Sequence, residues 1–143
     1  MRVLVVDDEP DVLLLCRVNF EFAGHEVLEA RDGDQALEVA KKEKPDVIVL
    51  DIMLPRRDGL AILDDLHKTE ATKDVPVVLL TAKTQGDDQL RAFRAGADEY
   101  VTKPFSPAVL TDTIERVGRM SAEERAEHRQ QAVEHLTGLD DDA

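Results

Sequence analysis

The 143-residue chain is poor in several residue types that mark particular classes of protein. A single cysteine, Cys16, cannot form a disulfide within the chain, which fits a reducing compartment, and its apolar neighbours predict an inert core thiol. Tryptophan is absent and aromatic residues make up 3%. Basic residues number 18 against 31 acidic ones, a formal net charge of −13. This charge and the scarcity of aromatic side chains argue against direct binding of nucleic acid or of anionic lipid.

Long hydrophobic runs are also missing. No apolar stretch nears the ~20 residues that span a bilayer, and the chain does not open with the basic and apolar regions of a signal peptide. We therefore expect a cytoplasmic protein without a membrane partner. Hydrophobic residues at 43% and charged residues at 34% are typical of one globular domain of this length.

Short apolar runs rich in β-branched residues predict five strands, which span 3–6, 26–30, 46–50, 75–80 and 99–102. Helical spacing of apolar residues predicts helices between and after them, at 11–22, 34–43, 59–68, 86–95 and 108–117. This strict alternation predicts a doubly wound α/β fold, with a five-stranded parallel sheet and right-handed crossovers.

In such a sheet, ligands bind beyond the carboxyl ends of the strands. The polar residues at those ends are Asp7, Asp8, Asp51, Thr81 and Lys103. Clustered carboxylates become tolerable when a cation lies among them, and Mg²⁺ is commonly held by carboxylates together with waters and phosphate oxygens. Asp51 can itself be a nucleophile, because a carboxylate is ionised at neutral pH without a base. The pattern predicts metal-assisted phosphoryl transfer at this edge of the sheet.

Each of these residues also has a simpler interpretation when it is taken alone. An acidic residue after a strand often caps the next helix, a threonine there often belongs to a turn, and a lysine is usually solvated. Their coincidence at one sheet edge favours a functional site.

Over about residues 1–119, the chain resembles the receiver domain of two-component response regulators. The resemblance rests on four segments in the family's order and spacing: VLVVDDEP (3–10), PDVIVLDIMLPRRDG (45–59), VVLLTAK (77–83) and AGADEYVTKPF (95–105). It implies the flavodoxin-like (βα)5 receiver fold. It also implies a signalling switch that catalyses only its own aspartyl phosphorylation and dephosphorylation, and not a metabolic enzyme.

The resemblance implies roles for individual residues as well. Asp51 would accept a phosphoryl group from a histidine kinase or a histidine phosphotransfer protein. Asp7 and Asp8 would hold Mg²⁺, with Mn²⁺ as the alternative ion, together with Asp51 and the backbone carbonyl of Met53. The apolar Met53 side chain would not position attacking water, so we expect a long-lived phosphoryl state.

Lys103 would pair with the phosphoryl oxygens, and the Lys103–Pro104 bond would be cis. Thr81 would move to hydrogen-bond the phosphoryl group, and Tyr100 would turn inward into the space that opens. The surface made by the fourth helix, the fifth strand and the fifth helix would change with them. That surface would then bind a downstream protein target or a second copy of the chain.

Three basic residues near the site have two interpretations each. Arg56 and Arg57 either draw in an anionic phosphoryl donor or form a solvated pair, and the solvated pair is favoured. Lys83 either flanks the phosphoryl group or points to water.

The helix predicted at 11–22 carries two apolar faces. Val12, Leu15, Cys16 and Phe20 are assigned to the core, whereas Leu14, Val18 and Phe22 form a second stripe offset from it. An exposed stripe of this kind suggests docking of a partner helix, here a kinase or phosphotransfer protein. Burial under a loop or in a homodimer is the alternative.

Residues 120–143 form a C-terminal extension with an acidic end. Ser121 and Glu124 make a capping box, so we predict a short, weakly amphipathic sixth helix that stops at Gly138. His128 and His135 are expected to be solvated. The extension is too short for a DNA-binding output domain, so the chain is either a stand-alone receiver or a fragment of a longer regulator. Its domain-sized length favours the stand-alone interpretation.

Two functions from other classes share part of this pattern. A flavodoxin-like flavin binder needs a first loop rich in glycine, serine or threonine, but DDEPD (7–11) stands there. An aspartyl phosphatase would carry its nucleophile after the first strand with a second aspartate two residues on, where this chain has Glu9.

Overall fold

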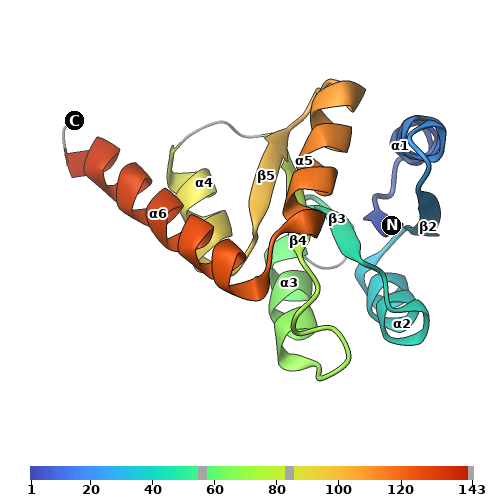
Figure 1. Cartoon of the computed structure of the whole chain (residues 1–143), viewed down its shortest axis with the longest axis horizontal. Coiled ribbons are helices and arrows are strands. Elements are labelled where there is room, and N and C mark those ends of the chain that lie inside the picture. Colours follow the sequence, from blue (N-terminus) through green and yellow to red (C-terminus); the bar gives the residue numbers. More distant parts are fainter. Residues whose placement is uncertain (55–57, 83–85, 142–143) are drawn as a thin grey trace.

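The computed structural model describes the backbone of residues 1–54, 58–82 and 86–141, and the side chains of the same ranges except 86–88 and 139–141. Five strands form one parallel sheet, shown in Figure 1: β1 (Arg2–Val6), β2 (Glu26–Ala30), β3 (Val47–Asp51), β4 (Val77–Thr81) and β5 (Glu99–Thr102). Their order is β2-β1-β3-β4-β5. The predicted doubly wound fold is confirmed, with β1 and β3 side by side at the centre.

Two strands end one residue later than predicted. Asp51 is the last residue of β3 and pairs with Leu80 of β4, while Thr81 is the last residue of β4 and pairs with Thr102 of β5. Both polar residues therefore belong to the sheet itself, and the sheet fixes the positions of their backbones.

Six helices connect and follow the strands: α1 (Pro10–Phe22), α2 (Gly33–Glu43), α3 (Gly59–Lys68), α4 (Gly86–Arg94), α5 (Pro107–Arg119) and α6 (Ala122–Asp141). Side-chain caps begin α2, α3 and α5, and also α6 as described below. Asp32 accepts from the Gln35 N–H before α2, and Asp58 accepts from the Leu60 N–H before α3. Ser106 accepts from the Val109 N–H before α5. Within the described ranges, no helix is both long and apolar enough to cross a membrane.

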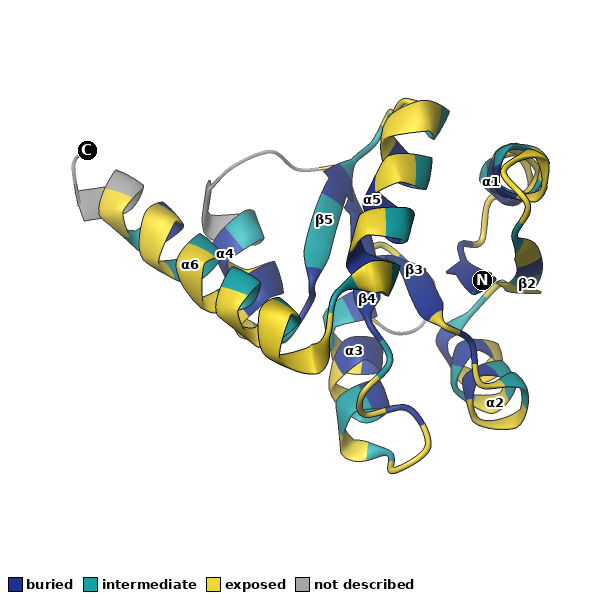
Figure 2. Cartoon of the chain, in the orientation of Figure 1, coloured by how far each residue is buried: buried dark blue, intermediate teal, exposed yellow. Residues whose placement is uncertain are grey.

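The helices lie on both faces of the sheet (Figures 1 and 2). Buried residues of α1 and α5 pack with one face of the strands, and those of α2, α3 and α4 pack with the other. The strands β3 and β4 are buried along their whole length. Apolar layers on both faces of the inner strands account for the continuously apolar sequences of β3 and β4.

The core face of α1 contains Leu13 in place of the predicted Leu15. Leu13 is buried at 3% exposure, together with Cys16 and Phe20, whereas Leu15 is 40% exposed. Spacings of three and four residues put 13, 16 and 20 on one helical stripe, and Leu15 lies about 100° away from Cys16. Burial raises the pKa of the Cys16 thiol to about 12, as suits the inert core thiol that was expected.

The sixth helix begins as predicted but ends later. The Ser121 N–H donates to Glu124 Oε1 at 2.8 Å, and the Glu124 N–H donates to Ser121 Oγ at 3.1 Å. The expected stop at Gly138 is wrong, because α6 continues to Asp141. A glycine costs a helix only ~1 kcal/mol relative to alanine, which weakens the helix without ending it.

Gly59, the first residue of α3, lies against the backbone that leaves β3. A Cβ at this position would come within 2.6 Å of the Ile52 Cα and 2.7 Å of the Asp51 carbonyl oxygen. We expect Gly59→Ala to lower the free energy of unfolding by about 1–3 kcal/mol, because the backbone that carries Asp51 must shift. Urea denaturation measures this change.

Gly138→Ala is the matched control, since nothing lies within 4 Å of a Cβ at that position. It should leave the stability unchanged or raise it slightly. Equal losses of stability in the two variants would contradict the steric interpretation of Gly59.

Candidate functional site

The carboxyl ends of β1, β3 and β5 bring three charged side chains together. Asp7 directly follows β1, Asp51 ends β3, and Lys103 directly follows β5. Lys103 Nζ lies 2.7 Å from Asp7 Oδ2 and 3.1 Å from Asp51 Oδ2. These are charge-assisted hydrogen bonds between groups that lie 96 and 52 residues apart in the chain.

All three side chains are sheltered from solvent. The side chain of Asp7 is 0% exposed, that of Asp51 is 4% exposed and that of Lys103 is 18% exposed. An isolated buried carboxylate is strongly disfavoured, so one ammonium group compensates two charges that could not otherwise remain there. Glu9, which is exposed, adds a longer contact of 3.6 Å to Lys103 Nζ.

Backbone N–H groups hold the second oxygen of each buried carboxylate. Asp7 Oδ1 accepts from the Glu9 N–H at 2.9 Å, and Asp51 Oδ1 accepts from the Met53 N–H at 2.9 Å. In both cases the donor lies two residues beyond the carboxylate. The turn that follows each strand therefore fixes the orientation of its aspartate.

The buried groups shift one another's ionisation. Burial raises the pKa of the Asp7 carboxyl, and the hydrogen bonds from Lys103 and the Glu9 N–H only partly offset this. For Lys103, burial lowers the pKa, but the hydrogen bonds to Asp7 and Asp51 together outweigh it, so the pKa is raised. The ammonium group stays charged at neutral pH.

The site has the oxygen ligands of a hard cation. Within the described part of the chain, oxygens of Asp7, Asp8, Glu9 and Asp51 all lie within 4.8 Å of one another. Asp7 and Asp51 are buried whereas Asp8 and Glu9 are exposed, so the cluster opens to solvent on one side. A set made only of carboxylate oxygens fits Mg²⁺ or Mn²⁺ better than a softer metal.

Glu9 is the member of this cluster that the sequence analysis left out of the ligand set. Its position directly after Asp8 in the sequence could have identified Glu9 as a further candidate ligand. Met53 lies at the mouth of the site with its side chain 69% exposed. A ligand role for its carbonyl stays a prediction.

Thr81 and Tyr100 lie on neighbouring strands beside this cluster. Thr81 is 6% exposed, and its carbonyl accepts from the Lys103 N–H at 2.7 Å. Tyr100 is partly buried on β5, and its ring meets that of Phe93 edge-on, with the centroids 5.7 Å apart. The peptide bond between Lys103 and Pro104 is cis. Arg56, Arg57 and Lys83, the basic residues considered near the site, lie outside the described residues.

Sequence reasoning missed a third buried carboxylate, which lies at the opposite edge of the sheet. Asp98 is 3% exposed, its Oδ2 accepts from the Val77 N–H at 2.9 Å, and its Oδ1 pairs with Arg129 of α6. The solvated state expected for His128 is wrong, because this ring is partly buried and its Nε2 lies 3.2 Å from Glu99 Oε2. His135 is exposed, as expected.

Known proteins match this chain both in sequence and in structure. The family model of the response regulator receiver domain matches residues 3–115. The chain is 41% identical over 120 residues to the alkaline phosphatase synthesis transcriptional regulatory protein PhoP of Bacillus subtilis, a match that covers 84% of this chain and 49% of that protein. It is 42% identical over 117 residues to the phosphate regulon transcriptional regulatory protein PhoB of Pseudomonas aeruginosa, which covers 82% of this chain and 51% of that protein.

Solved structures of response regulators also resemble this chain. Chemotaxis response regulator CheY4 of Vibrio cholerae aligns with a TM-score of 0.77 at 32% identity, over 81% of this chain and 97% of that chain. The receiver domain of NtrX from Brucella abortus aligns with a TM-score of 0.77 at 36% identity, over 83% of this chain and 99% of that chain. The chain spans about half the length of the transcriptional regulators it matches, and nearly the whole of these receiver structures. It belongs to the receiver-domain family of two-component response regulators, signalling switches that accept a phosphoryl group.

Proposed function

We propose that Asp51 is the phosphoryl acceptor of this receiver and that Lys103, Asp7 and Asp8 support the transfer. The observation that carries the proposal is the contact of one ammonium group, Lys103 Nζ, with the buried carboxylates of Asp7 and Asp51. In the reaction, an Asp51 oxygen bonds to phosphorus while the bond from phosphorus to the donor's histidine nitrogen breaks. The nitrogen keeps the electron pair, and the product is an aspartyl phosphate.

Charge neutralisation is the main task of the site. Four carboxylates face one ammonium group here, so an incoming phosphoryl group would be repelled without a further cation. Asp7, Asp8 and Asp51, with Glu9 nearby and the carbonyl of Met53, would hold Mg²⁺. A bound ion would supply positive charge beside the phosphoryl oxygens.

After transfer, Lys103 exchanges its contact with Asp51 for a phosphoryl oxygen. Thr81 supplies a hydroxyl hydrogen bond, and Tyr100 turns inward. The surface of α4, β5 and α5 changes with them, and it would bind a downstream protein or a second copy of the chain. Phosphorylation stabilises this state only through the additional contacts that it makes there.

This receiver would act in the cytoplasm, and its phosphoryl donor would be a histidine kinase or histidine phosphotransfer protein docked on α1. Leu14, Val18 and Phe22 are 59%, 58% and 94% exposed, and Leu15 extends this apolar surface. Such a stripe fits an apolar partner helix. We propose no nucleic-acid partner and no membrane partner for the part of the chain that the structure describes.

The first test is the intact mass after incubation with acetyl phosphate. We expect one phosphoryl adduct that requires Mg²⁺ and is absent from Asp51→Asn, because the amide is not a nucleophile for phosphorus. An adduct that persists in Asp51→Asn would assign the acceptor elsewhere. Turnover of a phosphomonoester would instead support an aspartyl phosphatase.

Metal binding can be tested without phosphorylation. Mg²⁺ at ~100 times its dissociation constant should raise Tm by about 5–10 °C relative to protein with EDTA, because the ion binds only the folded state. Asp7→Asn removes a carboxylate ligand and should reduce this shift by at least about half. Glu38→Gln, on the exposed surface of α2, is the matched control and should keep the full shift. An unchanged shift in Asp7→Asn would argue against this ligand set.

The exposed, apolar Met53 predicts slow loss of the phosphoryl group. A polar side chain there could position the attacking water, so Met53→Asn should shorten the lifetime of the phosphorylated protein by about tenfold or more. Met53→Leu keeps the position apolar and should leave the lifetime unchanged. The measurement is decay of the adduct by mass spectrometry, and loss within seconds from the unaltered protein would refute the expectation.

A further inference from the structure

Helix α6 packs across α4 and the adjoining strand β5 (Figures 1 and 2). Leu90 and Phe93 of α4 form an apolar cluster with Leu136 of α6, which is 8% exposed. Tyr100 of β5 and the α6 residues Ala132 and Val133 border this cluster. The ring of Tyr100 thus lies at the contact between α4, β5 and α6.

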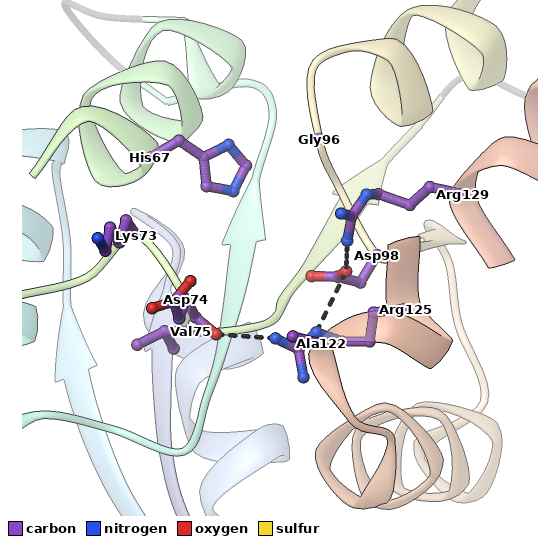
Figure 3. A pocket seen from close by; sticks show the side chains of 9 residues that line it. All are labelled: His67, Lys73, Asp74, Val75, Gly96, Asp98, Ala122, Arg125 and Arg129. Carbon is purple, nitrogen blue, oxygen red and sulfur yellow. Dashed lines mark hydrogen bonds and ion pairs between the residues drawn. The ribbon is translucent and has the colours of Figure 1, made fainter. Parts of the chain in front are cut away.

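Charged contacts fix the beginning of α6 to the amino end of β5. Arg129 Nη1 pairs with Asp98 Oδ1, and Arg125 Nε lies 3.5 Å from the same oxygen. Arg125 Nη2 also donates to the Asp74 carbonyl at 2.9 Å. Figure 3 shows both arginines beside a pocket of about 220 Å³ and the carboxylate of Asp98 between them.

The apolar part of this contact is small. Leu136 is the one buried side chain among the α6 residues whose side chains are described. Burial of one leucine changes an equilibrium constant by about 10–150-fold, so docking of this part of the helix is readily reversed. The other contacts that oppose release of α6 are those of its arginines with Asp98, that of His128 with Glu99, and the partial burial of Ala132 and Val133.

A short stretch of β5 connects this contact to the phosphorylation site. Tyr100 lies two residues before Thr102, which pairs with Thr81, and three residues before Lys103, which contacts Asp51. A rearrangement at Asp51 and Thr81 therefore acts on the strand that carries an aromatic ring of the α6 contact.

We propose that α6 is a reversible intramolecular ligand of the α4–β5 face, defined by Leu90, Phe93, Asp98, Glu99 and Tyr100, and that phosphorylation of Asp51 weakens its docking. The inference rests on the proposed function, in which Tyr100 turns toward Thr81. An inward turn of Tyr100 would change its present edge-on contact with Phe93 beside α6. Because linkage is reciprocal, release of α6 favours phosphorylation. A protein that binds this face must displace α6.

The composition of the chain provides a specific probe. Tyr100 is its only tyrosine, so incorporation of 3-fluorotyrosine gives a protein with one ¹⁹F resonance, at the contact itself. Leu136→Asp removes the buried anchor of α6. Gln131→Asp introduces the same side chain at an exposed position of the same helix and is the matched control.

In the unphosphorylated protein, Leu136→Asp should shift the ¹⁹F resonance and raise amide hydrogen exchange in α6 by about tenfold or more. Gln131→Asp should do neither, and slow exchange in β1 and β3 should show that the sheet is intact in both variants. An unchanged resonance and unchanged exchange in Leu136→Asp would overturn the proposal.

Acetyl phosphate and Mg²⁺ are then added, with the intact mass recorded on the same sample. Adduct formation on the unaltered protein should shift the resonance in the direction seen for Leu136→Asp and raise exchange in α6.

The outcomes separate the two proposals. An adduct on the unaltered protein without a change in the resonance or in exchange of α6 overturns the coupling and leaves the function of Asp51 standing. An adduct that forms only on Leu136→Asp supports strong coupling. No adduct on any variant refutes the function proposed for Asp51, and the coupling falls with it.

Discussion

The contact of Lys103 with Asp7 and Asp51 is the interaction on which the rest of this molecule depends. Two carboxylates with almost no exposure to solvent require a compensating cation, and the chain places its ammonium group within 3.1 Å of both. That contact forms only if β1, β3 and β5 run parallel and end at the same edge of the sheet. The topology that builds the core therefore also assembles the site, and an altered strand order would leave buried charge uncompensated.

The two edges of the sheet serve different purposes. The carboxyl edge carries an excess of negative charge that opens to solvent at Asp8 and Glu9, as suits a site for a cation and a phosphoryl group. At the amino edge, the buried Asp98 is satisfied by a backbone N–H and by arginines of α6, and its role is attachment. The four-residue strand β5 runs from one of these edges to the other. It therefore connects the α6 contact at its amino end directly to the phosphorylation site at its carboxyl end.

The family match and helix α6 cover different parts of the chain. The receiver family model matches residues 3–115, and α6 begins at Ala122. Relatives such as PhoP and PhoB are named as transcriptional regulators and are about twice the length covered by the match. The contacts of α6 with Phe93, Asp98 and Glu99 are specific to this chain. The family enters the inference about α6 only through the proposed movement of Tyr100.

The sequence by itself determined the α/β alternation, the capping box at Ser121 and Glu124 and the five polar residues at the strand ends, because each of these follows from local pattern. It also placed Asp7, Asp51 and Lys103 together, since parallel strands bring their carboxyl ends to one edge. Only the tertiary structure decided that Leu13 and not Leu15 enters the core, and that α6 passes Gly138 and packs on α4 and β5. The role of Asp98 likewise depends on residues far away in the chain. Local periodicity identifies an apolar or charged face, whereas the partner of that face is chosen by packing of the whole chain.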